Sequence, residues 1–127
     1  MVLPRFDGDL LAVLLAAARG ELAGVRAGWK HEAAAGVVLA AAGYPHSPRR
    51  GDAITGIAEA LALPGVLVFH AGTALQDGRL VTAGGRVLTV VGRGNNLAEA
   101  VQCAYGGVER VRYAGQRYRQ DIGRGSE

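Results

Sequence analysis

Two adjacent arginines, Arg49 and Arg50, stand in a segment rich in proline and glycine, GYPHSPRRGD, at residues 43–52. A guanidinium group presents its N–H donors in a planar fork that suits phosphate and carboxylate groups. Pro45 and Pro48 restrict the backbone, which lowers the entropy cost of gathering positive charge around an anion. The segment therefore predicts a loop that binds the phosphate of a small molecule. Two solvated arginines in a surface turn are the alternative.

A second candidate for anion binding is the run Gly84, Gly85 and Arg86. Backbone N–H groups of a Gly-Gly turn can come close to an anion. A hairpin turn with a flanking surface arginine is the alternative. Gly43 and Tyr44 either set the position of the loop predicted to bind phosphate or simply end the strand that precedes this loop.

Other chemistry has weaker support in the sequence. His70 and the other two histidines, His31 and His46, show no spacing typical of metal ligands, so we expect no metal site. We expect His70 to be packed or hydrogen-bonded. Cys103 lies in a predicted helix without a recognisable histidine partner, so a buried small side chain is expected rather than a nucleophile. No residue is therefore predicted to be catalytic.

Arginine supplies 13 of the 14 basic side chains, and the formal net charge is +3. This charge is too small to indicate nucleic-acid binding by itself. Basic and aromatic side chains alternate near the C-terminus and could form a nucleic-acid surface, but a solvated helix end followed by a tail docked on the domain is favoured. These residues are Arg110, Arg112, Tyr113, Arg117, Tyr118 and Arg119.

Length and composition indicate one α+β unit in a reducing compartment. The chain has 127 residues, of which half are apolar, and 20 glycines interrupt the apolar runs as turns. Cys103 alone cannot form an internal disulfide, which fits the cytoplasm. The longest strongly apolar run, at 10–18, is well short of the ~20 residues that span a membrane. Neither a membrane segment nor a signal peptide is expected.

The first part of the chain predicts a helix followed by strands. Residues 8–19 carry a leucine stripe, with Asp7 or Asp9 as the N-terminal cap and Gly20 as the C-terminal stop. Residues 28–32 predict a short edge strand. Residues 37–42 are apolar throughout and predict a strand covered on both faces.

The middle of the chain predicts one or two helical turns at 54–65 and then an antiparallel meander. Its strands cover residues 66–75, 79–83 and 86–92. Asp77-Gly78 forms the first turn and Gly84-Gly85 the second.

A last helix begins at Asn96, which has capping-box spacing to Glu99. Gly106 and Gly107 interrupt this helix at roughly 1 kcal/mol each relative to alanine. The predicted α+β fold is a small, mostly antiparallel sheet, made of the three-stranded meander plus one or two further strands, with an N-terminal and a C-terminal helix. The apolar face of the last helix is predicted to carry Leu97, Val101, Ala104, Val108 and Val111.

Five short motifs occur in order between residues 35 and 123, namely GYP, GDxITG, FHAGT, DGxLVTxGGRVL and RxDIG. Together they resemble the C-terminal domain of the phosphoribosylamine–glycine ligase family, the glycinamide ribonucleotide synthetases. Residues 2–31 also resemble this family, in which they close the preceding ATP-grasp domain. The resemblance implies that residues 1–34 are the tail end of an ATP-grasp domain and residues 35–127 the C-terminal ligase domain.

The resemblance implies a reaction in de novo purine biosynthesis. ATP phosphorylates the carboxylate of glycine, and the amine of 5-phosphoribosylamine attacks the acyl phosphate to give glycinamide ribonucleotide. The complete enzyme needs ATP and Mg²⁺ or Mn²⁺, and this chain alone is expected to bind none of them.

The nucleotide-binding lysines, glycine-rich flap and metal ligands of the family are not in this sequence. The expected partner is therefore the ATP-grasp portion of the ligase, in the same or a separate chain, with 5-phosphoribosylamine as the small-molecule substrate. The chain would form one wall of the substrate site and be inactive alone. The rival hypotheses are a non-catalytic module that binds a sugar phosphate or nucleotide, and a structural remnant without a site.

Overall fold

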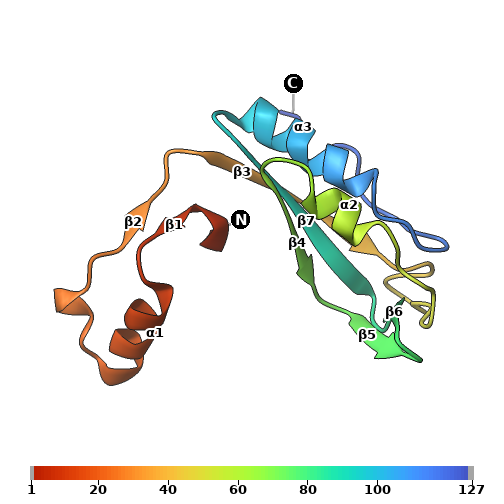
Figure 1. Cartoon of the computed structure of the whole chain (residues 1–127), viewed down its shortest axis with the longest axis horizontal. Helices are drawn as coiled ribbons and strands as arrows, with labels where there is room; N and C mark the ends of the chain where they lie inside the picture. The colour runs from red at the N-terminus through yellow and green to blue at the C-terminus, as the bar shows by residue number, and fades with distance from the viewer. Residues whose placement is uncertain (1, 126–127) are drawn as a thin grey trace.

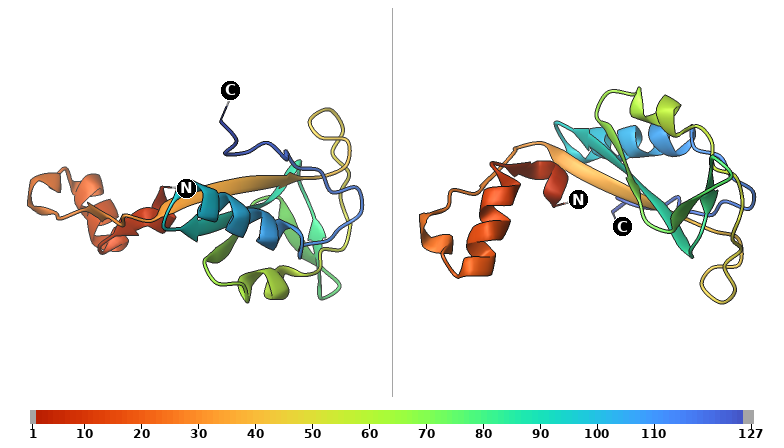
Figure 2. Two further views of the ribbon diagram at one scale, coloured as in Figure 1. Left: turned by 90° about the horizontal axis from the view of Figure 1, so that it is seen from above. Right: turned by 60° about the horizontal axis from the view of Figure 1, so that its bottom comes forward.

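The computed structural model describes residues 2–125, which form an N-terminal arm and a body (Figure 1). Both views in Figure 2 place the arm to one side of the body, beyond the start of the long strand β3. The arm holds η1 (Leu3–Arg5), β1 (Phe6–Asp7), α1 (Leu10–Arg19), η2 (Leu22–Gly24) and β2 (Gly28–Trp29). The body holds β3 (Ala33–Ala40), α2 (Ile57–Leu61), β4 (Val66–His70), β5 (Thr73–Gln76), β6 (Arg79–Thr82), β7 (Arg86–Gly94) and α3 (Leu97–Val108).

Local signals determine the ends of the two long helices, as predicted. The Asp9 carboxylate caps α1 by accepting from the Ala12 N–H at 3.0 Å, and Gly20 ends the helix in the left-handed conformation. Asn96 caps α3 by accepting from the Glu99 N–H at 2.9 Å, while the Glu99 carboxylate accepts from the Asn96 side chain. The short helix α2 lies inside the predicted 54–65 segment.

The predicted meander is only partly right: the hairpin at Asp77-Gly78 is confirmed, but the strand after it does not pair with β7. The main sheet has the order β3-β7-β4, all antiparallel, so the last strand in sequence lies at its centre. The predicted strand at 66–75 breaks at Ala71–Gly72, and β5 leaves to form a separate hairpin with β6. A Cβ atom on Gly72 would lie 2.7 Å from the Arg86 carbonyl oxygen, so the chain lies against the start of β7 at a point that admits no side chain.

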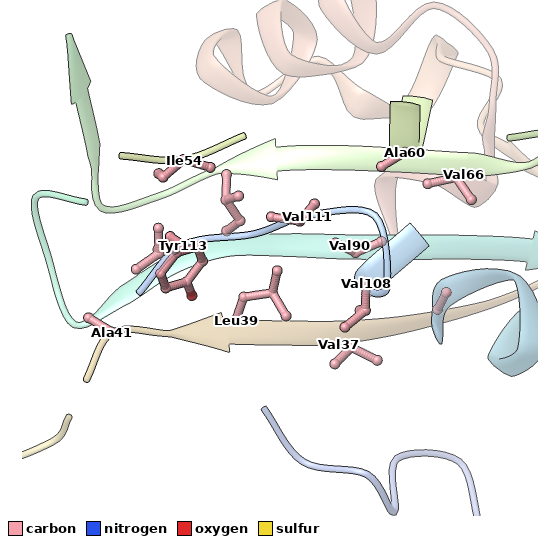
Figure 3. Close-up of a cluster of buried hydrophobic side chains, with 13 residues drawn as sticks. Val37, Leu39, Ala41, Ile54, Ala60, Val66, Val90, Val108, Val111 and Tyr113 are labelled. Carbon is pink, nitrogen blue, oxygen red and sulfur yellow. The ribbon is translucent and has the colours of Figure 1, made fainter. Parts of the chain in front are cut away.

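Helix α3 covers one face of this sheet, and the main core lies between them (Figure 3). Helix α3 comes closest to β7 at positions that carry small residues. Gly92 of β7 lies against the backbone of Ala100 and Ala104, which admits no Cβ there. Burial contributes roughly 1.5–3 kcal/mol for each large aliphatic side chain. The largest fully buried ones include Val37, Leu39, Leu88, Val90, Val108 and Val111.

The predicted helix face is therefore only partly right. Ala104, Val108 and Val111 are buried, but Val101 is only partly buried and Leu97 is 54% exposed. The buried face of α3 instead includes Ala100 and Gly107. The expectation that residues 37–42 are covered on both faces is also wrong. Val38 in β3 is 41% exposed on the face away from α3.

Adjacent glycines in α3 provide a matched test of this packing. A Cβ on Gly107 would lie 2.8 Å from methyl groups of Val66 and Val90, whereas the nearest atom to one on Gly106 is 3.9 Å away, on Leu63. Gly107→Ala should lower the free energy of unfolding by about 1–2 kcal/mol, and Gly106→Ala should raise it by up to about 1 kcal/mol. Urea denaturation of the 127-residue chain measures both. Equal effects would contradict close packing at Gly107.

Candidate functional site

The proline-containing loop leaves β3 and is fixed by backbone hydrogen bonds. The Ser47 N–H donates to the Gly43 carbonyl, and the Arg49 N–H donates to the Ala42 carbonyl at 2.8 Å. Gly43 has φ +80°, and a Cβ there would collide with the Ser47 carbonyl, so the turn requires glycine. Pro45 follows Tyr44 through a cis peptide bond and is exposed.

Tyr44 extends from this loop across the Gly84-Gly85 turn. A Cβ on Gly85 would overlap the Tyr44 ring, so the absence of a side chain lets the ring lie on the turn. Gly84 instead lies against Gly72. Both glycines therefore serve close packing, and anion binding by their N–H groups stays a prediction.

Tyr44 and Arg86 line a groove of about 430 Å³ on the face of β3 away from α3. Val38 and Ala40 contribute apolar surface to it. The groove thus contains two of the predicted site residues, one from the proline-containing loop and one from the start of β7. Its remaining lining residues are Arg117, Tyr118 and Arg119.

The last three lining residues belong to a C-terminal segment that returns to β3. Arg117 and Ala40 exchange backbone hydrogen bonds of 2.7 and 3.0 Å. The Tyr105 hydroxyl of α3 donates to the Arg119 carbonyl at 2.7 Å and accepts from the Ile122 N–H. The prediction of a docked tail is confirmed. The sequence did not indicate that this tail forms a groove wall; its only signal was the Arg-Tyr-Arg run beside the RxDIG motif.

Arg119 has an ionic partner at the rim of the groove. Its Nε donates to the Asp121 carboxylate at 2.8 Å, and this hydrogen bond lowers the pKa of Asp121 to about 2. Both side chains are largely exposed, so solvent screens the pair and an incoming anion could compete for the guanidinium.

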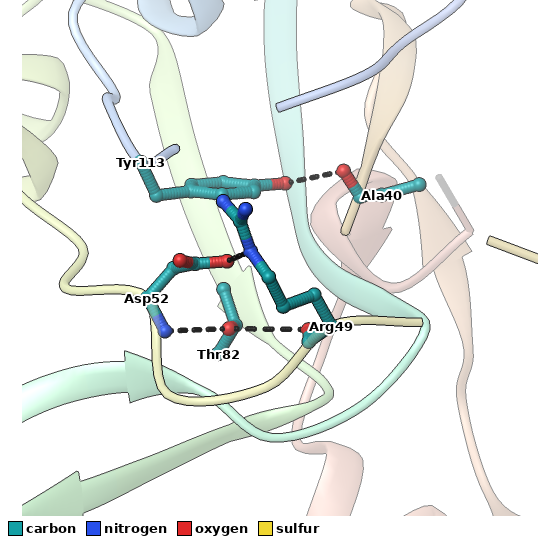
Figure 4. Close-up of polar contacts among 5 residues, drawn as sticks. All are labelled: Ala40, Arg49, Asp52, Thr82 and Tyr113. Carbon is teal, nitrogen blue, oxygen red and sulfur yellow. Dashed lines mark hydrogen bonds and ion pairs between the residues drawn. The ribbon is translucent and has the colours of Figure 1, made fainter. Parts of the chain in front are cut away.

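The two arginines singled out first do not line this groove. Arg49 donates from Nε to the Asp52 carboxylate at 2.8 Å, and Arg50 is exposed. Figure 4 shows the Arg49 guanidinium directed toward Asp52. Phosphate contact by Arg49 and Arg50 stays a prediction, but the structure places Arg49 in a different environment from Tyr44 and Arg86.

Tyr113 is the buried polar side chain behind the groove. Its hydroxyl donates to the Ala40 carbonyl at 3.0 Å, and burial raises the pKa of Tyr113 well above its ordinary value of 10.0. A tyrosine hydroxyl is protonated at neutral pH, so it is a donor to Ala40 there.

Neither His70 nor Cys103 contributes to the groove. The His70 imidazole forms a hydrogen bond of 3.0 Å with the Thr73 hydroxyl. The prediction that His70 is packed or hydrogen-bonded is therefore confirmed. Cys103 is partly buried, and its thiol donates to the Pro64 carbonyl at 3.1 Å. Within residues 2–125, no three His, Cys, Asp or Glu side chains come together where they could hold a metal ion. In the same range no helix has the length and apolarity to cross a membrane.

Comparison with known proteins gives the class to which this fold and groove belong. Residues 34–125 match the family model described as phosphoribosylglycinamide synthetase, C domain. Because the match covers most of the chain, the protein belongs to this family. The predicted family and the α+β fold class are therefore confirmed.

Individual relatives carry one enzyme name, phosphoribosylamine–glycine ligase. The Caulobacter vibrioides relative is 50% identical over 121 residues, and the Ralstonia nicotianae relative is 46% identical over 122 residues. The chain spans only 28% of the length of each. A crystal structure of the Thermotoga maritima ligase matches with a TM-score of 0.58 and 47% identity, covering 66% of this chain and 20% of that one.

Proposed function

We propose that this chain is the C-terminal part of a phosphoribosylamine–glycine ligase, which joins glycine to 5-phosphoribosylamine at the expense of ATP in purine biosynthesis. Residues 1–34 would be the tail end of the ATP-grasp domain, and residues 35–127 the C-terminal domain. The main support is the groove, which combines three arginines with two tyrosines above an apolar floor. The proposed location is the cytoplasm, which the lone cysteine fits.

The groove residues would hold the phosphoribosyl group while the reaction takes place on the ATP-grasp portion. Guanidinium groups of Arg86, Arg117 and Arg119 suit a phosphate because their donors are fixed in a plane. Tyr44 and Tyr118 would cover the sugar and reduce its contact with water. ATP and Mg²⁺ or Mn²⁺ would supply activation of the glycine carboxylate in the complete enzyme. The described residues bring together no cluster of metal ligands, so no step is assigned to a metal on this chain.

Removing groove arginines tests this function. Arg86→Ala with Arg119→Ala should weaken binding of ribose 5-phosphate to the 127-residue chain about 10-fold or more, because one charge-assisted contact is worth roughly 1.5–3 kcal/mol. Isothermal titration calorimetry measures the affinity. The control, Arg79→Ala with Arg110→Ala, removes the same charge from exposed positions outside the groove.

If the groove variant and the control variant lose the same affinity for ribose 5-phosphate, net charge alone would explain the binding. Absence of ribose 5-phosphate binding by the wild-type chain would contradict a sugar-phosphate site, and would leave the structural-remnant hypothesis. Product formation when the ATP-grasp portion is added would distinguish the ligase from a non-catalytic binding module.

We infer that the arm packs against the ATP-grasp portion. Leu11 is 75% exposed and Leu14 is 58% exposed, although both belong to the apolar stripe of α1. Val2, Leu3 and Phe69 line a further hollow of about 370 Å³, which continues the apolar surface from the arm onto the open face of the main sheet. Exposed apolar patches of this kind mark interfaces. This chain spans only 28% of the length of the two relatives named above, so their remaining length could cover this apolar surface.

Acidic substitutions on α1 test this interface. Leu11→Glu with Leu14→Glu should weaken association with the ATP-grasp portion of the ligase about 10-fold or more, because burying one leucine is worth roughly 1.5–3 kcal/mol. Analytical ultracentrifugation of the two portions measures the association. Leu75→Glu is the matched control, since Leu75 is 77% exposed on β5, away from the arm. Equal weakening by the control, or none by the α1 pair, would contradict the interface.

A further inference from the structure

Arg49 has an ionic partner within the protein, although its own side chain is 53% exposed. Its Nε lies 2.8 Å from an Asp52 carboxylate oxygen, and the Asp52 side chain is only 15% exposed. A terminal nitrogen of Arg49 lies 3.6 Å from where a Cβ on Gly115 would stand. Figure 4 draws both the pair of Arg49 with Asp52 and the hydrogen bond from Tyr113 to Ala40. Arg49 therefore reaches from the proline-containing loop to the C-terminal segment, and Asp52 already balances its charge.

Thr82 of β6 hydrogen-bonds the main chain at Arg49 and Asp52. This polar residue is buried, with only 1% of its surface exposed. The Thr82 hydroxyl accepts from the Asp52 N–H at 3.1 Å and donates to the Arg49 carbonyl at 3.5 Å. The Thr82 carbonyl also accepts from the Gly51 N–H, and its N–H donates to the Asp52 carbonyl. These contacts fix the end of the loop from which Tyr44 extends.

The Tyr113 hydroxyl donates to the Ala40 carbonyl, which also accepts from the Arg117 N–H at 3.0 Å. Ala40 and Arg117 both line the groove. One carbonyl thus joins the floor of the groove to the wall that carries Arg117, Tyr118 and Arg119. The opposite wall, Tyr44, belongs to the loop that Arg49 and Thr82 hold.

We propose that Arg49, Asp52, Thr82 and Tyr113 form a positioning cluster that fixes the two walls of the groove relative to each other. Arg49 is then a positioning residue rather than a phosphate ligand. Walls held in place before binding reduce the entropy cost of closing around a ligand, so the cluster raises affinity without touching the ligand. The inference rests on the proposed sugar-phosphate function of the groove.

Asp52→Asn distinguishes the two roles of Arg49 by the sign of its effect. If Arg49 were a phosphate ligand, removing the competing carboxylate would strengthen anion binding. Loss of the cluster should instead weaken binding of ribose 5-phosphate by about 3- to 10-fold, despite the extra unit of positive charge. Tyr113→Phe, which removes only a hydroxyl, should weaken binding by a similar factor. Calorimetry on the 127-residue chain measures both variants.

Asp77→Asn is the matched control because it makes the same change in charge at an exposed turn outside the groove. Asp77 has φ +49°, a conformation that asparagine tolerates well. This control should bind ribose 5-phosphate at least as tightly as the wild-type chain. Tighter binding by Asp52→Asn than by Asp77→Asn would overturn the positioning role and restore Arg49 as a ligand.

Amide hydrogen exchange supplies a readout that needs no ligand. In Asp52→Asn and Tyr113→Phe, the Ala40 and Arg117 amides should exchange at least about 3-fold faster, while amides in the centre of β7 stay protected. Unchanged exchange at Ala40 and Arg117 would overturn the cluster. If the wild-type chain does not bind ribose 5-phosphate, the proposed function fails, and the exchange rates still decide whether the cluster holds the walls.

Discussion

The close approach of α3 to β7 is the constraint on which the rest of the body depends. Gly92 of β7 lies directly against the α3 backbone, and Gly107 of α3 packs against Val66 and Val90. Because the helix lies this near the sheet, its end is placed where Val111 and Tyr113 enter the core. The chain after α3 can then return to the edge strand β3, which is why a groove exists at that edge.

The groove combines parts that are distant in sequence, and backbone pairing holds them together. The bridge between Ala40 and Arg117 brings the C-terminal segment to the end of β3, where the proline-containing loop begins. Tyr105 holds the same segment from the helix side. Behind the groove, Tyr113 and Asp52 have internal hydrogen-bond partners, whereas the arginines that line the groove are exposed. This division separates residues that hold the walls from residues available to an anion.

The sequence predicted features that depend on neighbouring residues. The caps at Asp9 and Asn96 follow from side chains within three residues of the helix start. Strand order depends on distant contacts, so the central position of β7 could not be read from an alternating apolar pattern. Leu97 was placed in the core by helical spacing, but the buried face of α3 instead includes Ala100 and Gly107.

For the site, Tyr44 and Arg86 were predicted and do meet in the groove. Arg49 and Arg50 look equivalent in the sequence, and only the fold shows that one is paired with Asp52. Asp52 lies within three positions of both arginines, so its presence in the sequence does not show which one it pairs with. Arg117 and Arg119 needed the long-range bridge to β3, for which a single sequence carries no local signal.

A crystal structure of the chain with ribose 5-phosphate tests the central claim most directly. The account predicts the phosphate in the groove, within hydrogen-bonding distance of Arg86 or Arg119, with the Arg49 side chain still bonded to Asp52. A phosphate held by Arg49 and Arg50, with Arg49 released from Asp52, would contradict it.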